Sequence, residues 1–370
     1  MNSSTENLKR YNWVDFGRGI AVLLVIMIHT SHSFSNSDFL KNFTNAGAMG
    51  VQLFFILSAF TLFNSFKQRY EKDGEKRIKL FFLRRFFRIA PLYYFFALFY
   101  TLVEIALKGI HTIEYWKILM CVMFLNGIFV PVINYIPPGG WSIGTEVLFY
   151  CLVPFLFKKI KTTKHAVYLL LFSILLSNII NYIVQAIVYL LKISDNDLSK
   201  RLYTYQWLPN QLPVFCCGIL LFYIFNSVHF SKEIRKIFLT LSICIFILLS
   251  QIHLSLNYLY YTFQSPYLYS IAFCFFIIGI KNYEFNNGLS NLFCLIGKYS
   301  FSMYLLHFFI LRIFSIAFSY TGFERQSDLT FLLSYIFVTA ITFFFSSILY
   351  KYEIKGIAFG NLQIKKISKV

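Results

Sequence analysis

Ten long apolar runs, separated by short charged segments, follow one another along the 370-residue chain. Each is close to the length of about 20 residues that a helix needs to cross a bilayer. In lipid, every backbone polar group must find a partner within the protein, so the runs predict an all-α polytopic membrane protein of about ten transmembrane helices. We expect these helices at residues 16–34, 47–66, 89–107, 141–157, 166–191, 208–226, 237–254, 266–280, 299–319 and 329–350.

The composition places the whole chain in the membrane class. Hydrophobic residues make up 58% of the sequence and charged residues only 14%, values far from those of a soluble domain. We therefore predict a single transmembrane domain over residues 1–370, with a short cytoplasmic tail at 351–370. The net charge of +18 could suggest nucleic acid as a partner. The basic residues lie between the apolar runs, however, so we expect no nucleic-acid ligand.

The distribution of lysine and arginine predicts the orientation. Ten spans put both termini on one side, and 26 of the 34 basic residues fall in segments on that side. Since loops rich in these residues stay in the cytoplasm, both termini are expected there. The run 117–133 would be an eleventh span by hydropathy alone, and it would move the basic segment 158–164 outside. We expect a re-entrant or interfacial segment instead; a real span, compensated by the loss of another, would also fit.

Two ionisable residues, Arg18 and His29, stand eleven positions apart in the first apolar run. At about 100° per residue, eleven steps return to within roughly 20° of the same helix face, and the rise separates the two by about 16 Å. Ionisable groups inside a span are costly unless they face a polar cavity or a partner. The pair therefore predicts a polar path from the cytoplasmic edge towards the middle of the membrane.

Arg85 and Arg88 end the basic segment 67–88, which holds nine basic residues against three acidic ones. For Lys67 to Lys79, attraction to anionic lipid is an equally good explanation of the charge. Residues three apart share a helix face, so the two guanidinium groups are expected side by side where the third span begins. Paired guanidinium groups at the membrane edge suit a ligand that carries phosphate.

The stretch PPGGWSIGTEVLFY places Ser142 and Glu146 on one face of the fourth predicted span. Pro137 to Gly140 stop the preceding segment, and Ser142 is expected to cap the N-terminus of the new helix. A carboxylate in an apolar run needs a partner or becomes protonated. We expect Glu146 to serve a reaction site, and a structural ion pair with an arginine elsewhere is the alternative.

Polar residues also recur at helical spacing in IGKYSFSMYLLHFF, where Ser300, Tyr304 and His307 could line one cavity. A lone histidine in a span is more often a packed, hydrogen-bonded residue than a catalyst, and the same applies to His32 near the end of the first span. The seven cysteines form no cluster with metal-ligand spacing, so no metal site is expected.

Together these motifs resemble the integral-membrane acyltransferase 3 family, which includes bacterial O-acetyltransferases acting on surface polysaccharide. The resemblance runs along nearly the whole chain. The motifs that carry it are Asp15-x-x-Arg18 followed by His29, GVQLFFILSAF, Arg85-Phe-Phe-Arg88 followed by IAPLYY, WSIGTEVLFY and YSFSMYLLH. Each motif alone is weak, whereas their order and spacing make the match specific.

The resemblance implies transfer of an acyl group, usually acetyl, from cytoplasmic acetyl-CoA across a bacterial inner (plasma) membrane. The acceptor would be a hydroxyl of an extracytoplasmic cell-surface polysaccharide, such as O-antigen, capsule or exopolysaccharide, or of its lipid-linked precursor. The implied site residues are His29, Glu146 and Ser142 for catalysis, and Arg18, Arg85 and Arg88 for binding the acyl donor. Many relatives carry a further hydrolase-like domain after the last span; the present sequence ends about twenty residues beyond that span, so none is expected.

The two lines of reasoning lead to one mechanistic hypothesis. The phosphates of coenzyme A would stay at the arginines, and its uncharged pantetheine arm would extend towards His29. A neutral imidazole is a good general base near pH 7, and it would accept the proton of the incoming hydroxyl. Glu146 would orient the imidazole, and Ser142 would hydrogen-bond the acceptor or the oxyanion. Direct transfer and a transient acyl-histidine both use His29 and stay open.

Other classes fit part of the pattern. A secondary transporter would also have about ten spans with buried charges, but no clear repeat relates residues 1–185 to 186–370. An acyltransferase acting on a lipid or a small molecule would keep the chemistry and change the acceptor. A structural membrane protein would have no use for Arg18, His29 and Glu146 within its spans.

Overall fold

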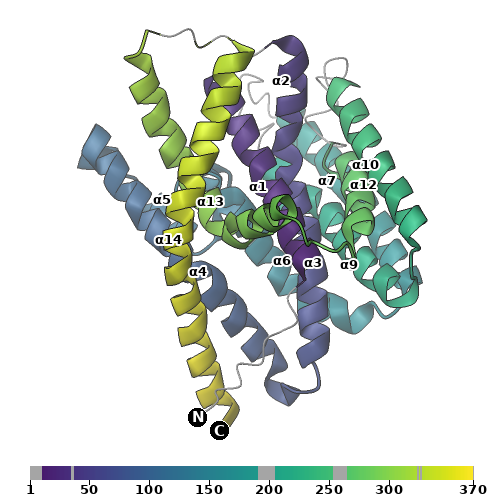
Figure 1. Ribbon diagram of the computed structural model, residues 1–370. Helices are drawn as coiled ribbons and strands as arrows, with labels where there is room; N and C mark the ends of the chain where they lie inside the picture. Colours follow the sequence, from purple (N-terminus) through teal and green to yellow (C-terminus); the bar gives the residue numbers. More distant parts are fainter. Residues whose placement is uncertain are drawn as a thin grey trace.

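The chain folds into a bundle of long helices (Figure 1), and no β-strand occurs in the part that the structure describes. The computed structural model describes residues 11–34, 37–190, 205–252, 265–322, 325 and 327–369. The predicted span ends at 191 and 254 lie outside these residues. The long helices are α1 (Asn12–Ser33), α3 (Gly50–Arg69), α4 (Arg77–Lys108), α6 (Gly140–Lys159), α7 (Thr163–Leu190), α9 (Leu208–Ser227), α10 (Lys232–Ile252), α12 (Ser265–Ile280), α13 (Gly288–Ser319) and α14 (Asp328–Lys369), with the short helices α2 (Asp38–Asn45) and α5 (Tyr115–Val122).

Each predicted span coincides with one of the ten long helices. Eight helical segments are long and apolar enough to cross a membrane by length and composition. Of the other two helices, α12 is apolar but shorter, and α10 packs along it so closely that a Cβ on Gly279 would lie 2.9 Å from that of Leu239. The prediction of an all-α, multi-pass membrane protein is therefore confirmed.

The start of α1 and the end of α14 lie at the same end of the bundle, beside the basic connection between α3 and α4. The Lys76 ammonium group donates a hydrogen bond of 3.1 Å to the carbonyl of Ile367 in α14. Tyr11, directly before α1, accepts one of 3.4 Å from Asn64 of α3. We call this the basic end of the bundle, at the bottom of Figure 1, and the opposite one the outer end. The basic end is the one predicted to face the cytoplasm.

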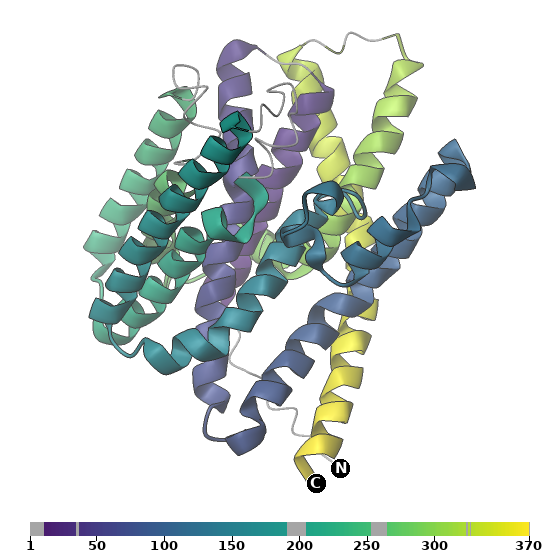
Figure 2. The same ribbon diagram turned by 180° about the vertical axis from the view of Figure 1, so that it is seen from behind.

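The run 117–133 forms no transmembrane helix, as predicted. It contains most of α5, which has eight residues, and short 3₁₀ turns at Leu125–Gly127 and Val130–Val132. An eight-residue helix rises about 12 Å, far less than the thickness of the hydrocarbon layer. The segment lies against α4 (Figure 2), where the buried side chain of Asn126 donates a 3.1 Å hydrogen bond to the Tyr93 hydroxyl. The side-chain amide nitrogen of this segment is thus hydrogen-bonded within the protein, as irregular backbone at membrane depth requires packing against protein.

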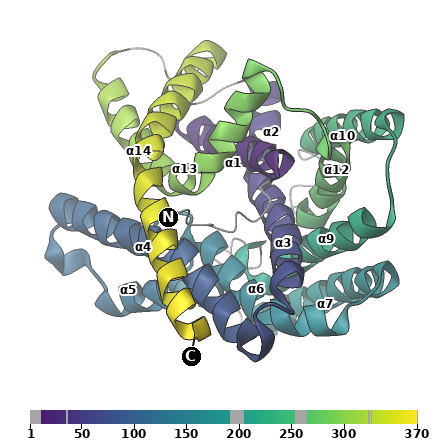
Figure 3. The ribbon, with the colours of Figure 1, turned by 60° about the horizontal axis from the view of Figure 1, so that its bottom comes forward.

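The last helix is longer than expected. α14 has 42 residues, so the predicted tail at 351–370 is largely the second half of a helix. Figure 3 shows this half passing over α4 at the basic end. Gly356 and Gly360 lie directly against Pro91 and Phe87 of α4. The helix continues because packing on α4 stabilises it, which the hydropathy of the segment alone does not reveal.

Two glycines let α1 and α13 approach closely near the basic end. A Cβ on Gly297 would lie 1.6 Å from the carbonyl oxygen of Asp15, and one on Gly19 would lie 2.3 Å from that of Phe293. Only glycine fits where helix backbones come this close. The Sγ of Cys294, near the start of α13, lies 3.4 Å from the carbonyl oxygen of Asn12, so both helices run from the basic end outwards.

Replacing Gly297 by valine is expected to lower the yield of folded protein several-fold. Its first side-chain carbon would already overlap the backbone of α1, and overpacking a tight core costs about 1–3 kcal/mol or more. The measurement is the amount of monodisperse protein recovered from membranes. Gly288→Val is the matched control, since no atom lies within 4 Å of its Cβ position. Equal yields for the two variants would contradict this packing.

Candidate functional site

A cavity of about 400 Å³ lies between α1, α3, α4, α6, α13 and α14, towards the basic end. This volume is within the range of small-molecule sites, roughly 300–1,000 Å³. The charged residues and the predicted polar residues that line it are Asp15, Arg18, Ser58, Arg85, Arg88, Ser142, Glu146, Lys298, Ser300, Tyr304 and Glu353. The structure thus brings five of the six predicted site residues into one cavity, and the exception is His29.

The three arginines of the cavity come from two helices, Arg18 from α1 and both Arg85 and Arg88 from α4. None of them forms an ion pair with a carboxylate of the described chain. Arg85 donates a 2.8 Å hydrogen bond to the Ser65 hydroxyl, while its buried Nε has no partner among the described residues. Clustered guanidinium groups repel one another in a low-dielectric site, so an anionic ligand would stabilise them.

Arg85 and Arg88 share the cavity face of α4, as their spacing predicts. The adjacent Arg84 points elsewhere and is paired with Asp73 in the α3–α4 connection. Neighbouring positions of α4 therefore differ in role: Arg85 and Arg88 line the cavity, whereas Arg84 pairs with the α3–α4 connection.

Glu146 lies among the arginines rather than beside His29. One carboxylate oxygen of Glu146 accepts hydrogen bonds from the hydroxyls of Ser58 and Tyr150, the latter at 2.7 Å. Glu146 lines the same cavity as Arg18, Arg85 and Arg88. The expectation that Glu146 orients the imidazole is not met, because α6 brings this carboxylate to the arginine end of the cavity.

Ser142 is the third residue of α6 and not its N-cap, contrary to expectation. The cap is Gly139, whose φ of 74° favours glycine, so the helix begins at Gly140. The hydroxyls of Ser142 and Tyr304 lie 2.8 Å apart. They lie 3.1 and 3.0 Å, respectively, from the carbonyl oxygen of Gly139. This polar cluster closes the inner end of the cavity.

His29 lies outside the cavity lining, beyond that inner end. Its ring centroid is 4.3 Å from that of Phe308 and 5.3 Å from that of His307. The ring of His307 is in turn 5.8 Å from that of Tyr304, which does line the cavity. The cavity that contains Arg18 therefore does not include His29, which packs on aromatic side chains of α13, a helix that the spacing within α1 cannot reveal.

Tyr100 of α4 holds the part of α13 that carries His307. Its hydroxyl donates to the carbonyl of Leu305 at 2.9 Å and accepts from the amide of Phe309 at 3.1 Å. In a regular helix, the amide of residue 309 would donate to the carbonyl of residue 305. The Tyr100 hydroxyl is hydrogen-bonded to both of these backbone groups, which lie on either side of His307 in the sequence. Such an insertion bends helices, and α13 changes direction along its length (Figure 1).

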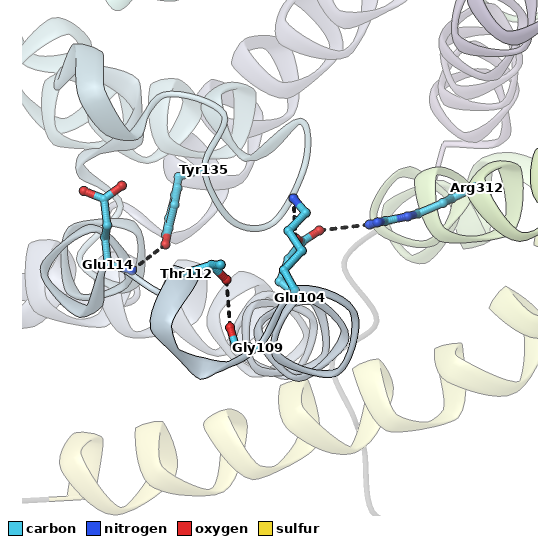
Figure 4. A network of polar contacts seen from close by, with 7 residues as sticks. Glu104, Gly109, Thr112, Glu114, Tyr135 and Arg312 are labelled. Carbon is cyan, nitrogen blue, oxygen red and sulfur yellow. Dashed lines mark hydrogen bonds and ion pairs between the residues drawn. The ribbon is translucent and has the colours of Figure 1, made fainter.

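Further towards the outer end, an ion network links α4 to α13. Arg312 pairs with Glu104 at 2.9 Å, and Lys108 pairs with the same carboxylate at 2.8 Å (Figure 4). In the same view, the amide of Glu114 donates to the Tyr135 hydroxyl at 2.8 Å. Arg312, which lies within the predicted span 299–319, therefore belongs to a partly exposed ion pair outside the cavity.

Two charged residues of the cavity, Lys298 and Glu353, do not stand out in the sequence. Lys298 belongs to the part of α13 that precedes the predicted span at 299–319. Glu353 falls in the predicted tail and reaches the cavity only because α14 continues as a helix.

Tyr304→Phe is expected to lower the free energy of unfolding by about 1 kcal/mol, the usual worth of one hydrogen bond. The ring would stay in place while its contacts with Ser142 and Gly139 are lost. Thermal unfolding in detergent measures this effect. Tyr299→Phe is the control, because its ring packs on Phe343 and no described residue hydrogen-bonds its hydroxyl. Equal melting temperatures for the two variants would contradict the hydrogen bonds of Tyr304 with Ser142 and Gly139.

The acyltransferase domain family matches residues 11–351, nearly the whole chain. Over 95 residues the chain is 30% identical to the peptidoglycan O-acetyltransferase OatA of Listeria monocytogenes serovar 1/2a. That stretch covers 25% of this chain and 14% of the length of OatA, so the chain matches only a small part of that relative. No solved structure matches the chain.

Proposed function

Because the chain belongs to the acyltransferase 3 family, we propose that it moves an acyl group, most simply acetyl, from cytoplasmic acetyl-CoA to a hydroxyl of a cell-surface carbohydrate. It would do so in the inner (plasma) membrane of a bacterium. The observation that supports this best is the convergence of Arg18, Arg85 and Arg88 on one cavity without an ion pair in the described chain.

The donor would bind with its charged end towards the basic end of the bundle. Guanidinium groups form bidentate, charge-assisted hydrogen bonds with phosphate oxygens, which suits Arg85 and Arg88 at the start of the apolar part of α4. The pantetheine arm is uncharged and thin enough to follow the cavity inwards. The rise of about 16 Å between Arg18 and His29 is comparable with its reach.

The chemistry would take place beyond Tyr304, at His29. The acceptor hydroxyl attacks the thioester carbonyl, a carbon–oxygen bond forms, and the carbon–sulfur bond breaks. His29 takes the hydroxyl proton and returns it to the departing thiolate. Ser142, at the inner end of the cavity, would donate a hydrogen bond to the thioester oxygen. The side chains of Tyr304 and Phe308 must swing aside for the thioester to reach the imidazole.

The acceptor is proposed to be a carbohydrate because the named relative is a peptidoglycan O-acetyltransferase. Peptidoglycan fragments therefore join O-antigen, capsule and exopolysaccharide oligosaccharides, and their lipid-linked precursors, as candidate acceptors. An acceptor of another class, a lipid or a small molecule, would use the same donor site.

Reconstituted vesicles test the proposal. Purified protein is inserted into liposomes that enclose candidate oligosaccharides, and acetyl-CoA labelled in the acetyl group is added outside. We expect label on the enclosed carbohydrate and an equal amount of free coenzyme A outside. Label in the lipid fraction would favour the lipid acceptor. Labelled donor that accumulates inside without release of coenzyme A would indicate transport and refute acyl transfer.

A further inference from the structure

We propose that His307 is a positioning residue that accepts a hydrogen bond from the His29 imidazole and orients it for the reaction. This inference rests on the proposed function and adds a residue that the family resemblance does not assign. It begins from a buried nitrogen: His307 is fully buried, and its Nε2 has no hydrogen-bond partner among the residues that the structure describes.

The local hydrogen bonding of His307 fixes the chemistry of that nitrogen. Nδ1 lies 3.2 Å from the carbonyl oxygen of Met303. A carbonyl oxygen can only accept, so Nδ1 carries the hydrogen and Nε2 presents a lone pair. A buried acceptor without a partner costs about 1–3 kcal/mol. His307 therefore offers an acceptor that no described residue uses.

The rings of His29 and His307 already have the right spacing. Their centroids are 5.3 Å apart, with 34° between the ring planes. Two imidazoles joined by an N–H···N hydrogen bond have centroids about 5 Å apart, because each nitrogen lies roughly 1 Å from the centre of its ring. The centroid distance of 5.3 Å therefore allows this hydrogen bond when the two nitrogens face each other.

The packing of the two helices sets this spacing. Gly19 of α1 and Gly297 of α13 touch, and the helices run in the same direction. His29 and His307 each stand ten residues further along, which is about 15 Å on either helix. The same glycine pair that brings the backbones together thus brings the two histidines to one level.

Other candidates for this role fit less well. Glu146 is bonded to Ser58 and Tyr150 at the arginine end of the cavity. His32 is exposed, and its ring lies 6.2 Å from that of His29 at a steep angle of 77°. The third ring against His29 belongs to Phe308, which carries no polar group.

The proposed bond would act while His29 holds a proton. When one nitrogen of His29 takes the hydroxyl proton, the other keeps its N–H directed at Nε2 of His307. The acceptor stabilises the imidazolium and holds its ring in line with the thioester. The proton then passes from His29 to the departing thiolate, and His307 itself neither gains nor loses one.

Three substitutions of His307 test this role through kcat and KM for acetyl-CoA in the vesicle assay. His307→Phe fills the space without an acceptor, and His307→Asn keeps only a group near Nδ1. Both are expected to lower kcat about 10–100-fold, as lost supporting hydrogen bonds do at other sites, with KM within threefold of the wild type. His307→Gln can place its amide oxygen near the lost Nε2 and should recover at least half of the loss on a logarithmic scale. His32→Gln is the control and should leave kcat within twofold.

The pattern among the variants decides the outcome. A glutamine variant no better than phenylalanine would overturn the proposal, as would three variants that lose folded protein equally. A parallel rise in KM would also overturn it, because the residue would then act on donor binding. These failures differ from failure of the proposed function, in which the wild-type protein itself would release no coenzyme A.

Discussion

His29→Ala is expected to abolish acyl transfer while the protein still accumulates in the membrane. A general base in the transition state contributes about 10²–10⁴-fold to the rate, so its loss should leave almost no turnover. Because His29 lies outside the cavity that would hold the donor, the affinity for coenzyme A should stay unchanged. The vesicle assay gives kcat, and equilibrium binding of labelled acetyl-CoA to detergent-purified protein gives Kd.

This combination separates a chemical role from a structural one. A misfolded variant would lose binding and turnover together, whereas loss of a catalytic group removes turnover alone. His32→Ala serves as the matched control, since it removes a histidine from the same helix at an exposed position. Normal acetylation by the His29 variant would refute its role and, with it, the proposed chemistry.

The double substitution Arg85→Ala with Arg88→Ala is expected to weaken acetyl-CoA binding by about 10²–10⁴-fold. Hydrogen bonds to charged groups contribute about 1.5–3 kcal/mol each, and two of them would be lost. Both arginines line the cavity and neither has a carboxylate partner in the described chain, so the loss should come from the ligand rather than from the fold. At saturating donor, kcat should remain close to that of the wild type.

Two comparisons sharpen this prediction. Lys79→Ala removes a positive charge from the same helix at an exposed position outside the cavity and should change Kd less than twofold. Arg85→Lys with Arg88→Lys keeps the charge but loses the planar fork, so its Kd should fall between those of the wild type and the alanine variant. An unchanged affinity in the alanine variant would remove the phosphate site from the proposal.

The sequence alone determined the class of the protein and the local geometry of its motifs. Long apolar runs can satisfy their backbone in lipid only as helices, so all ten predicted spans correspond to helices. The spacing of Arg85 and Arg88 fixed their shared face because helical periodicity is a local property. The run 117–133 was correctly excluded as a span because charge asymmetry constrains the whole chain.

Tertiary packing decided the rest. The sequence gives no distance between Glu146 and His29, and the structure joins this carboxylate to Ser58, 88 positions away in the chain. It also sets His307 beside His29 and ends the cavity at Tyr304. These relations depend on how closely helices far apart in sequence approach. In this bundle, the contact of Gly19 with α13 sets that approach, and the periodicity of a single helix carries no information about it.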